Sequence, residues 1–170
     1  MNSATRSIPP EPILMERDDI GRLTRLVFDG TPSSTSAQGN AWLIAVDGSA
    51  HALKAVEEFL KLAEQLKSCR IHIANVQHWL SKEAAETGLM ERGWPASEAA
   101  MALITAKGLP WQLHLTMGAP AESIVALARQ LGCSHIVLGN RGLGATESLL
   151  SGSITRKVIE LAPMSVLVVP

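Results

Sequence analysis

Residues 41–49 read Ala-Trp-Leu-Ile-Ala-Val-Asp-Gly-Ser, and this stretch decides the fold class. Its apolar run predicts a buried strand over 41–46, and Asp47-Gly48-Ser49 predicts a turn at the end of that strand. Apolar residues then recur at helical spacing from Leu53 to Leu66, with charged residues between them. The pattern therefore predicts a strand, a turn and an amphipathic helix, in that order.

The same alternation continues to the end of the chain. It predicts four more strands and three more helices, the strands over 70–77, 111–117, 135–138 and 165–169 and the helices over 97–107, 120–131 and 153–161. Strands that alternate with helices indicate an α/β fold, an open five-stranded parallel sheet with helices on both faces. In such sheets, ligands bind beyond the carboxyl ends of the strands, where the winding direction reverses.

The first forty residues precede this pattern, and we expect them to form an N-terminal extension that is partly disordered. Residues 13–28 allow two interpretations, a short helix that docks on the domain or a mobile tail. Residues 30–39 are rich in Gly, Ser and Thr and predict a flexible linker. The expected division is thus an extension over 1–40 and one domain over 41–170.

Charge and cysteine content exclude several classes of protein. The formal net charge of −1 and a pI near 6.5 argue against binding to nucleic acid. Cys69 and Cys133 have no metal-site spacing and form no disulfide framework, which favours a reducing compartment. No stretch approaches the roughly 20 apolar residues of a spanning helix. We therefore expect a cytoplasmic protein with no membrane partner.

A glycine-bearing segment, residues 139–153, leaves the fourth predicted strand and ends where the last helix begins. Glycines let backbone N–H groups approach an anion, and a helix N-terminus adds unpaired donors and a positive dipole end. Arg141 and Arg156 supply nearby positive charge. The alternative is a tight surface connection whose glycines only satisfy turn geometry.

Two common phosphate-binding motifs are absent from this segment. A P-loop needs a Lys directly after the second glycine of G-x-x-x-x-G, and the segment has none. The glycines of the dinucleotide fingerprint follow the first strand of its fold, whereas these follow the fourth. Placement alone thus leaves both interpretations open, a phosphate site and a surface connection.

The spacing Gly139-x2-Gly142-x9-Gly152-Ser153 resembles the glycine signature of the ATP-binding branch of the universal stress protein family. The resemblance covers residues 41–170 and includes four blocks in the family's order, residues 45–49, 137–144, 152–158 and 166–169. It implies a fold like that of the adenine nucleotide alpha hydrolases, with strand order 3-2-1-4-5.

The resemblance also implies a site for ATP, ADP or AMP, with Mg²⁺ as an ion that accompanies a triphosphate. Residues near the nucleoside would be Ala45, Val46, Asp47 and Val76; those near the ribose and phosphates would be Gly139, Arg141, Gly142, Gly152, Ser153 and Ile154. Taken alone, Asp47 is better explained as a helix N-terminal cap, and with the resemblance the two roles are compatible. Residues 78–96 match no family motif, and Glu147 puts a negative charge within the glycine loop.

The family's final strand commonly pairs with its counterpart in a second subunit. Residues 166–169 are apolar on both faces, so we expect a homodimer through this strand, the alternative being a covered edge in a monomer.

No catalytic machinery is evident in the sequence. The five histidines are scattered, and none has a catalytic spacing to a Ser, Cys or carboxylate. Three functions remain open, a nucleotide-responsive dimeric module in the stress response, a slow ATPase, and a dimeric stress factor without nucleotide. The absence of a candidate general base favours the first.

Overall fold

A computed structural model of the chain describes residues 9–30, 40–142 and 152–170. Its elements, in chain order, are β1 (Leu14–Arg17), β2 (Leu23–Asp29), β3 (Asn40–Ala45), α1 (Ala50–Ala63), β4 (Cys69–Gln77), α2 (Lys82–Ala106), β5 (Trp111–Met117), α3 (Pro120–Gln130), β6 (His135–Gly139), α4 (Ser153–Leu161) and β7 (Ser165–Val169). The linker expected at 30–39 lies almost wholly outside the described residues, as does the middle of the glycine loop.

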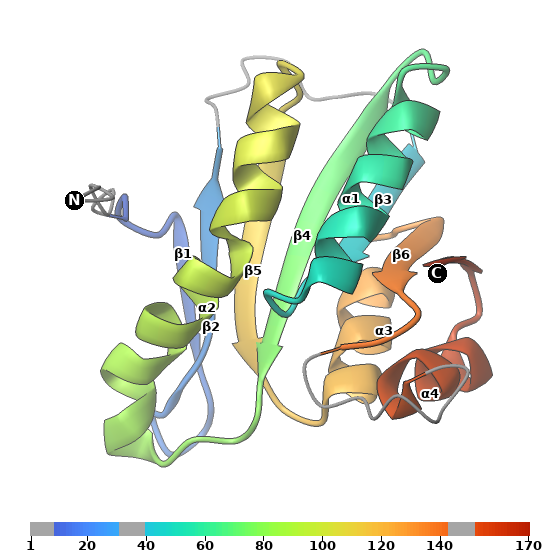
Figure 1. The fold of residues 1–170 in the computed structure, drawn as a ribbon. Coiled ribbons are helices and arrows are strands. Elements are labelled where there is room, and N and C mark those ends of the chain that lie inside the picture. The colour runs from blue at the N-terminus through green and yellow to red at the C-terminus, as the bar shows by residue number, and fades with distance from the viewer. Residues whose placement is uncertain (1–8, 31–39, 143–151) are drawn as a thin grey trace, which may run out of the picture.

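The sheet has seven strands in the order β1-β2-β5-β4-β3-β6-β7 (Figure 1). The prediction of five parallel strands is therefore wrong in number and in direction, because β1 and β2 add to the β5 edge as antiparallel strands. The other five strands are parallel and have the expected order 3-2-1-4-5. The sheet order reverses at β3, the first of these five.

Residues 14–29 form a β-hairpin, so both interpretations of this segment, a helix and a mobile tail, are wrong. Leu26 and Phe28 are buried beneath α2, while Val27 is buried on the opposite face of the sheet. A strand buried on both faces lacks the simple alternation that marks a half-exposed strand. Arg25 is also buried and forms an ion pair with Glu16 at 2.5 Å. Because a charged residue usually marks an exposed position, Arg25 hides the burial of this strand in the sequence.

Helix α2 is longer than the predicted helix over 97–107 and takes in most of residues 78–96. Gly88, Gly93 and Pro95 lie inside it, and all three residue types disfavour helix interiors. Its first turns hold the hairpin through an ion pair between Arg17 and Glu86 at 2.5 Å. The segment without a family motif thus covers the added hairpin.

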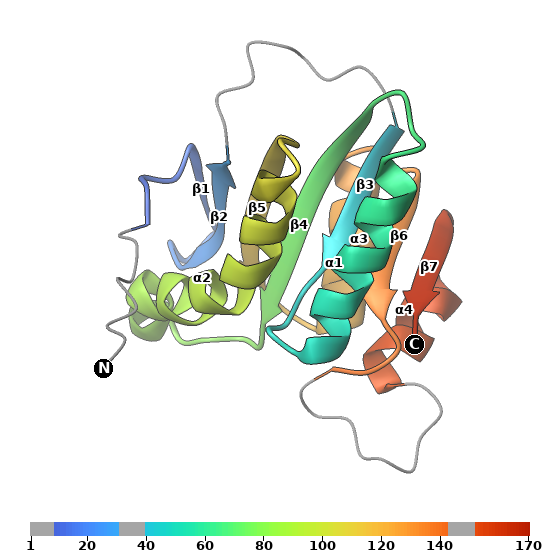
Figure 2. The same ribbon diagram turned by 45° about the horizontal axis from the view of Figure 1, so that its top comes forward.

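Helices α1 and α2 cover one face of the sheet, and α3 and α4 cover the other (Figures 1 and 2). Each face has its own hydrophobic cluster, which includes Phe59 of α1 and Ile73 of β4 on the first face and Val125 of α3 and Ile136 of β6 on the second. Within the described residues, no helix is both long and apolar enough to cross a membrane.

Candidate functional site

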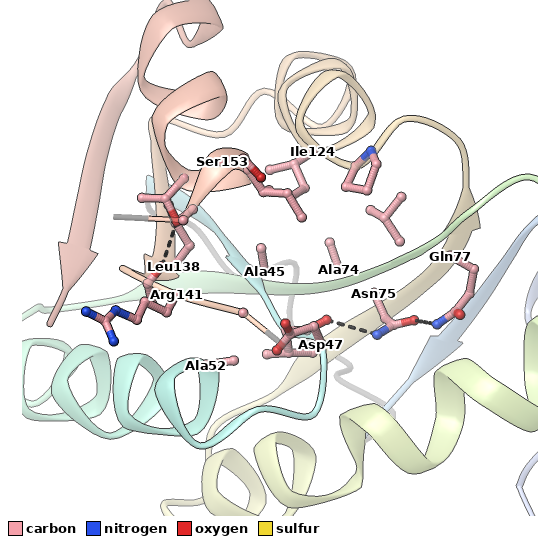
Figure 3. A pocket seen from close by; sticks show the side chains of 18 of the residues that line it. Ala45, Asp47, Ala52, Ala74, Asn75, Gln77, Ile124, Leu138, Arg141 and Ser153 are labelled. Atoms are coloured by element: carbon pink, nitrogen blue, oxygen red, sulfur yellow. Dashed lines mark hydrogen bonds between the residues drawn. The ribbon is translucent and has the colours of Figure 1, made fainter. Parts of the chain in front are cut away.

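A cavity of about 400 Å³ lies at the carboxyl ends of β3, β4 and β6 (Figure 3). This is the point where the sheet order reverses, as expected for an open α/β sheet. All ten residues singled out in the sequence line it, namely Ala45, Val46, Asp47, Val76, Gly139, Arg141, Gly142, Gly152, Ser153 and Ile154. Segments far apart in the chain therefore meet at one cavity.

One side of the cavity is apolar. Ala45 and Ala74 come from adjacent strands, and their small side chains leave room that larger residues would fill. Ile124 of α3 and Leu138 of β6 complete this side (Figure 3). These residues form an apolar slot that suits a flat, apolar ring.

Asp47 lies in the turn that leads from β3 into α1. Its Oδ1 accepts a hydrogen bond from the Ser49 N–H at 2.9 Å, and Gly48 takes the positive φ of 85° that the turn needs. Ser49 is the N-cap of α1, because its Oγ accepts from the Ala52 N–H at 3.1 Å. The interpretation of Asp47 as the helix cap is therefore wrong, and its carboxylate lines the cavity instead.

Two of the glycines lie where the protein approaches itself closely. A Cβ atom on Gly139 would lie 2.7 Å from the carbonyl carbon and oxygen of His51, in the first turn of α1. A Cβ atom on Gly142 would lie 2.5 Å from Oδ2 of Asp47. Both distances are far below ordinary contact, so a side chain at residue 139 would press on the backbone of α1, whereas one at residue 142 would have to displace the end of the Asp47 side chain or the loop.

Gly152 lines the cavity, as the resemblance implies, but its N–H group is bonded within the protein. Its N–H donates to the Asn140 carbonyl at 2.6 Å and so closes the loop at the start of α4. A Cβ atom here would meet nothing closer than 3.4 Å.

Helix α4 points its N-terminus at the cavity. The N–H groups of Ser153, Ile154 and Thr155 belong to the first turn, so they have no acceptor within the helix, and the dipole makes this end positive. Thr155 is buried, and its Oγ1 donates to the Gly139 carbonyl at 2.9 Å, which fixes α4 against the end of β6. Arg141 also lines the cavity. The N-terminus of α4 therefore favours binding of an anion.

Several lining residues were not predicted from the sequence, chiefly Asn75, Gln77 and His78. Asn75 is 1% exposed; its Nδ2 donates to the Val46 carbonyl at 2.9 Å, and its Oδ1 accepts from Gln77 Nε2. The available signal was one amide inside the otherwise apolar run of residues 73–76. A buried polar residue in a strand next to a predicted site is a reasonable candidate.

Three other histidines lie in strands of the sheet and pack against neighbouring rings. His72 Nδ1 and His114 Nε2 lie 3.1 Å apart on β4 and β5, and burial is the main cause that lowers the pKa of both rings, that of His114 to about 3. His135 stacks on Trp42. Across the described ranges, no group of three or more His, Cys, Asp and Glu side chains could hold a metal ion.

Comparison with known proteins identifies the family. Residues 42–170 match the model of the universal stress protein family. A universal stress protein of Thermus aquaticus is 34% identical over 132 residues, which cover 75% of this chain and 96% of the relative.

Solved structures of the same fold include a universal stress protein in complex with cAMP and one from Archaeoglobus fulgidus in complex with dAMP. The first has a TM-score of 0.64 and 23% identity over 80% of this chain and 99% of that one. The second has a TM-score of 0.60 and 20% identity over 78% of this chain and 98% of that one. The family model spans most of the chain, and the chain belongs to the universal stress protein family.

Proposed function

We propose that the cavity binds an adenine nucleotide, ATP, ADP or AMP, and that the protein is a dimeric module whose state responds to this ligand. One observation carries the proposal. An apolar slot, a carboxylate and a helix N-terminus line the same cavity, and they match the base, the ribose and the phosphates of a nucleotide.

The base would lie in the slot beside Ala45, Ala74 and Ile124. The direction of the Val76 backbone groups is the reason to propose adenine as the base. The Ala74 carbonyl faces β3, where it accepts from the Val46 N–H at 2.9 Å, and the Gln77 carbonyl faces β5, where it accepts from the Gly118 N–H. Because backbone direction alternates along a strand, both polar groups of Val76 face β3, just beyond its end. One donor beside one acceptor suits the edge of adenine.

The ribose would lie near Asp47, whose carboxylate can accept from its hydroxyl groups. The phosphates would lie at the start of α4, near Ser153, Ile154 and Arg141. Asp47 supplies the sole carboxylate among the lining residues that the structure describes, so Mg²⁺ would arrive with a triphosphate rather than occupy a site of its own.

Two structural relatives support this choice of ligand. They share the fold of this chain and were solved with cAMP and dAMP, which are both adenine nucleotides. The spacing of the glycines and Ser153, which resembles the signature of the family's ATP-binding branch, is a second reason for this choice.

The dimer would form through β7. The described sheet has two outer strands, and β1 is a poor edge for pairing because it has four residues and an irregular register between Glu16 and Arg17. Strand β7 has a regular register with β6 and an apolar sequence, Val166-Leu-Val-Val169. Antiparallel pairing of two β7 strands would close a symmetric dimer.

Denaturing the purified protein and identifying the released small molecules by mass spectrometry tests the proposed ligand. We expect an adenine nucleotide in a fixed ratio to protein. Recovery of a ligand from another chemical class in that ratio would contradict the proposal.

A further inference from the structure

The backbone ladder between β3 and β4 stops one bond earlier than its geometry allows. The last paired residues are Ala45 and Ala74, and one further bond runs from the Val46 N–H to the Ala74 carbonyl. In a parallel ladder, a residue donates its N–H to the carbonyl of one residue on the partner strand. Its own carbonyl accepts from the N–H of the partner-strand residue two positions further along. The next bond would therefore run from the Val76 N–H to the Val46 carbonyl.

That bond is replaced by a side chain. The Val46 carbonyl accepts from Asn75 Nδ2 at 2.9 Å, and none of the backbone hydrogen bonds between described residues joins Val76 to Val46. The amide of Asn75 thus satisfies the last carbonyl of β3 in place of the Val76 N–H.

The orientation of the Asn75 amide is fixed from both sides. A carbonyl oxygen only accepts, so the atom beside the Val46 oxygen must be the amide nitrogen. On the other side, Asn75 Oδ1 accepts from Gln77 Nε2.

Helix α2 then encloses the amide. A Cβ atom on Gly93 would lie 3.2 Å from Asn75 Oδ1 and 2.8 Å from Leu115, so the helix backbone lies directly above Asn75. The side chain is 1% exposed. It therefore has one arrangement in which its polar atoms are satisfied.

We propose that Asn75 is a positioning residue that keeps the Val76 N–H available to the cavity, where it donates to the ring nitrogen N1 of adenine. This inference rests on the proposed nucleotide function. Without the Asn75 amide, the buried Val46 carbonyl loses its donor, and the nearest replacement in the ladder is the Val76 N–H. The Val76 N–H would then pair with β3 and would no longer be available to the ligand.

Binding of AMP and of 1-deaza-AMP, in which C–H replaces N1, separates this role from a merely structural one. One net hydrogen bond corresponds to about a 3- to 10-fold change in affinity, so the wild-type protein should bind AMP tighter than the analogue by that factor. In Asn75→Leu, which has a similar size and no donor, the two affinities should be equal. A purely structural role would weaken both ligands by the same factor and keep their ratio.

Asn75→Ala provides a second variant, because it also removes the donor to the Val46 carbonyl, and it should likewise make the two affinities equal. Amide hydrogen exchange in the wild-type protein needs no substitution at all. The Val76 N–H should exchange rapidly without ligand, and AMP should slow it whereas 1-deaza-AMP should not.

Four outcomes overturn the inference. Equal binding of AMP and its analogue by the wild-type protein, or an unchanged ratio in folded variants, refutes the role of Asn75 alone. Slow exchange of the Val76 N–H in the unliganded protein does the same. A wild-type protein that binds no AMP contradicts the proposed function as well.

Discussion

The backbone of Gly142 lies against the carboxylate of Asp47, so close that a Cβ atom at residue 142 would be 2.5 Å from Oδ2. The first residue follows β6 and the second follows β3, the two strands on either side of the point where the sheet order reverses. This contact joins the glycine loop to the polar turn of the cavity. A larger residue at 142 would have to displace the Asp47 carboxylate or the loop, whether or not a ligand is bound.

Gly142→Ala should weaken nucleotide binding with little effect on stability. The new methyl group must displace either the loop or the Asp47 carboxylate, and both line the cavity. We expect the affinity for AMP to fall by about tenfold or more, which corresponds to ~1.4 kcal/mol. Gly88→Ala in α2, where a Cβ atom has 3.4 Å of room, is the matched control. Equal affinities of the two variants, measured by calorimetry, would refute the importance of this contact.

Gly139→Ala should act on stability instead. Its Cβ atom would lie 2.7 Å from the backbone of His51, so α1 and β6 must separate. Overpacking of this kind costs about 1–3 kcal/mol of unfolding free energy, which urea denaturation can measure. Gly152→Ala is the control in the same segment, because φ at Gly152 is −64° and a Cβ atom fits there. Similar midpoints for the two variants would show that the close approach is not rigid.

Mild acid should destabilise the protein through His114. Burial, the main cause, and the charges of His72 and Arg25 lower the pKa of His114 to about 3 from an ordinary value of 6.5. The unfolded chain thus binds a proton below pH 6.5 that the folded chain excludes until about pH 3. The free energy of unfolding therefore falls as pH drops, by up to ~1.4 kcal/mol per pH unit for one such group.

Denaturation midpoints between pH 7 and about pH 5, above the range where carboxyl groups titrate, measure this effect. His114→Gln keeps a polar atom near the position of Nε2 and does not titrate, so its pH dependence should be shallower. A slope identical to that of the wild-type protein would exclude His114 as its source.

Val168→Pro should convert the expected dimer to a monomer. The Val169 carbonyl accepts from the Asn140 N–H on the β6 side, so the backbone groups of Val166 and Val168 face outward by alternation. Proline at 168 removes one outward N–H without removing a bond to β6. Sedimentation velocity should show a dimeric wild-type protein and a monomeric variant. A monomeric wild-type protein would contradict pairing through β7.

The five parallel strands could be predicted because each has apolar residues in a continuous run or at alternating positions and is separated from the next by a helical pattern. The hairpin could not, since Val27 and Phe28 are buried on opposite faces and Arg25 is buried with a partner that only the fold supplies. The start of α2 was missed for a related reason. Gly93 is unfavourable within a helix, yet its lack of a side chain lets the helix pack on Asn75 and Leu115.

The ten predicted residues line one cavity because their strands and loops end at the same edge of the sheet. What the sequence could not show is how each contributes. Gly139 is explained by packing against His51, the Gly152 N–H is bonded to Asn140, and Ser49 rather than Asp47 caps α1. Asn75 was missed because its significance depends on which carbonyl lies beside it.

Calorimetric titration of the wild-type protein with ATP, ADP and AMP tests the proposed ligand most directly. We expect saturable binding of at least one of these nucleotides at one site per chain, with weaker binding in Gly142→Ala. No detectable binding of any adenine nucleotide, in a protein whose folding is confirmed by circular dichroism, would contradict nucleotide binding in this cavity.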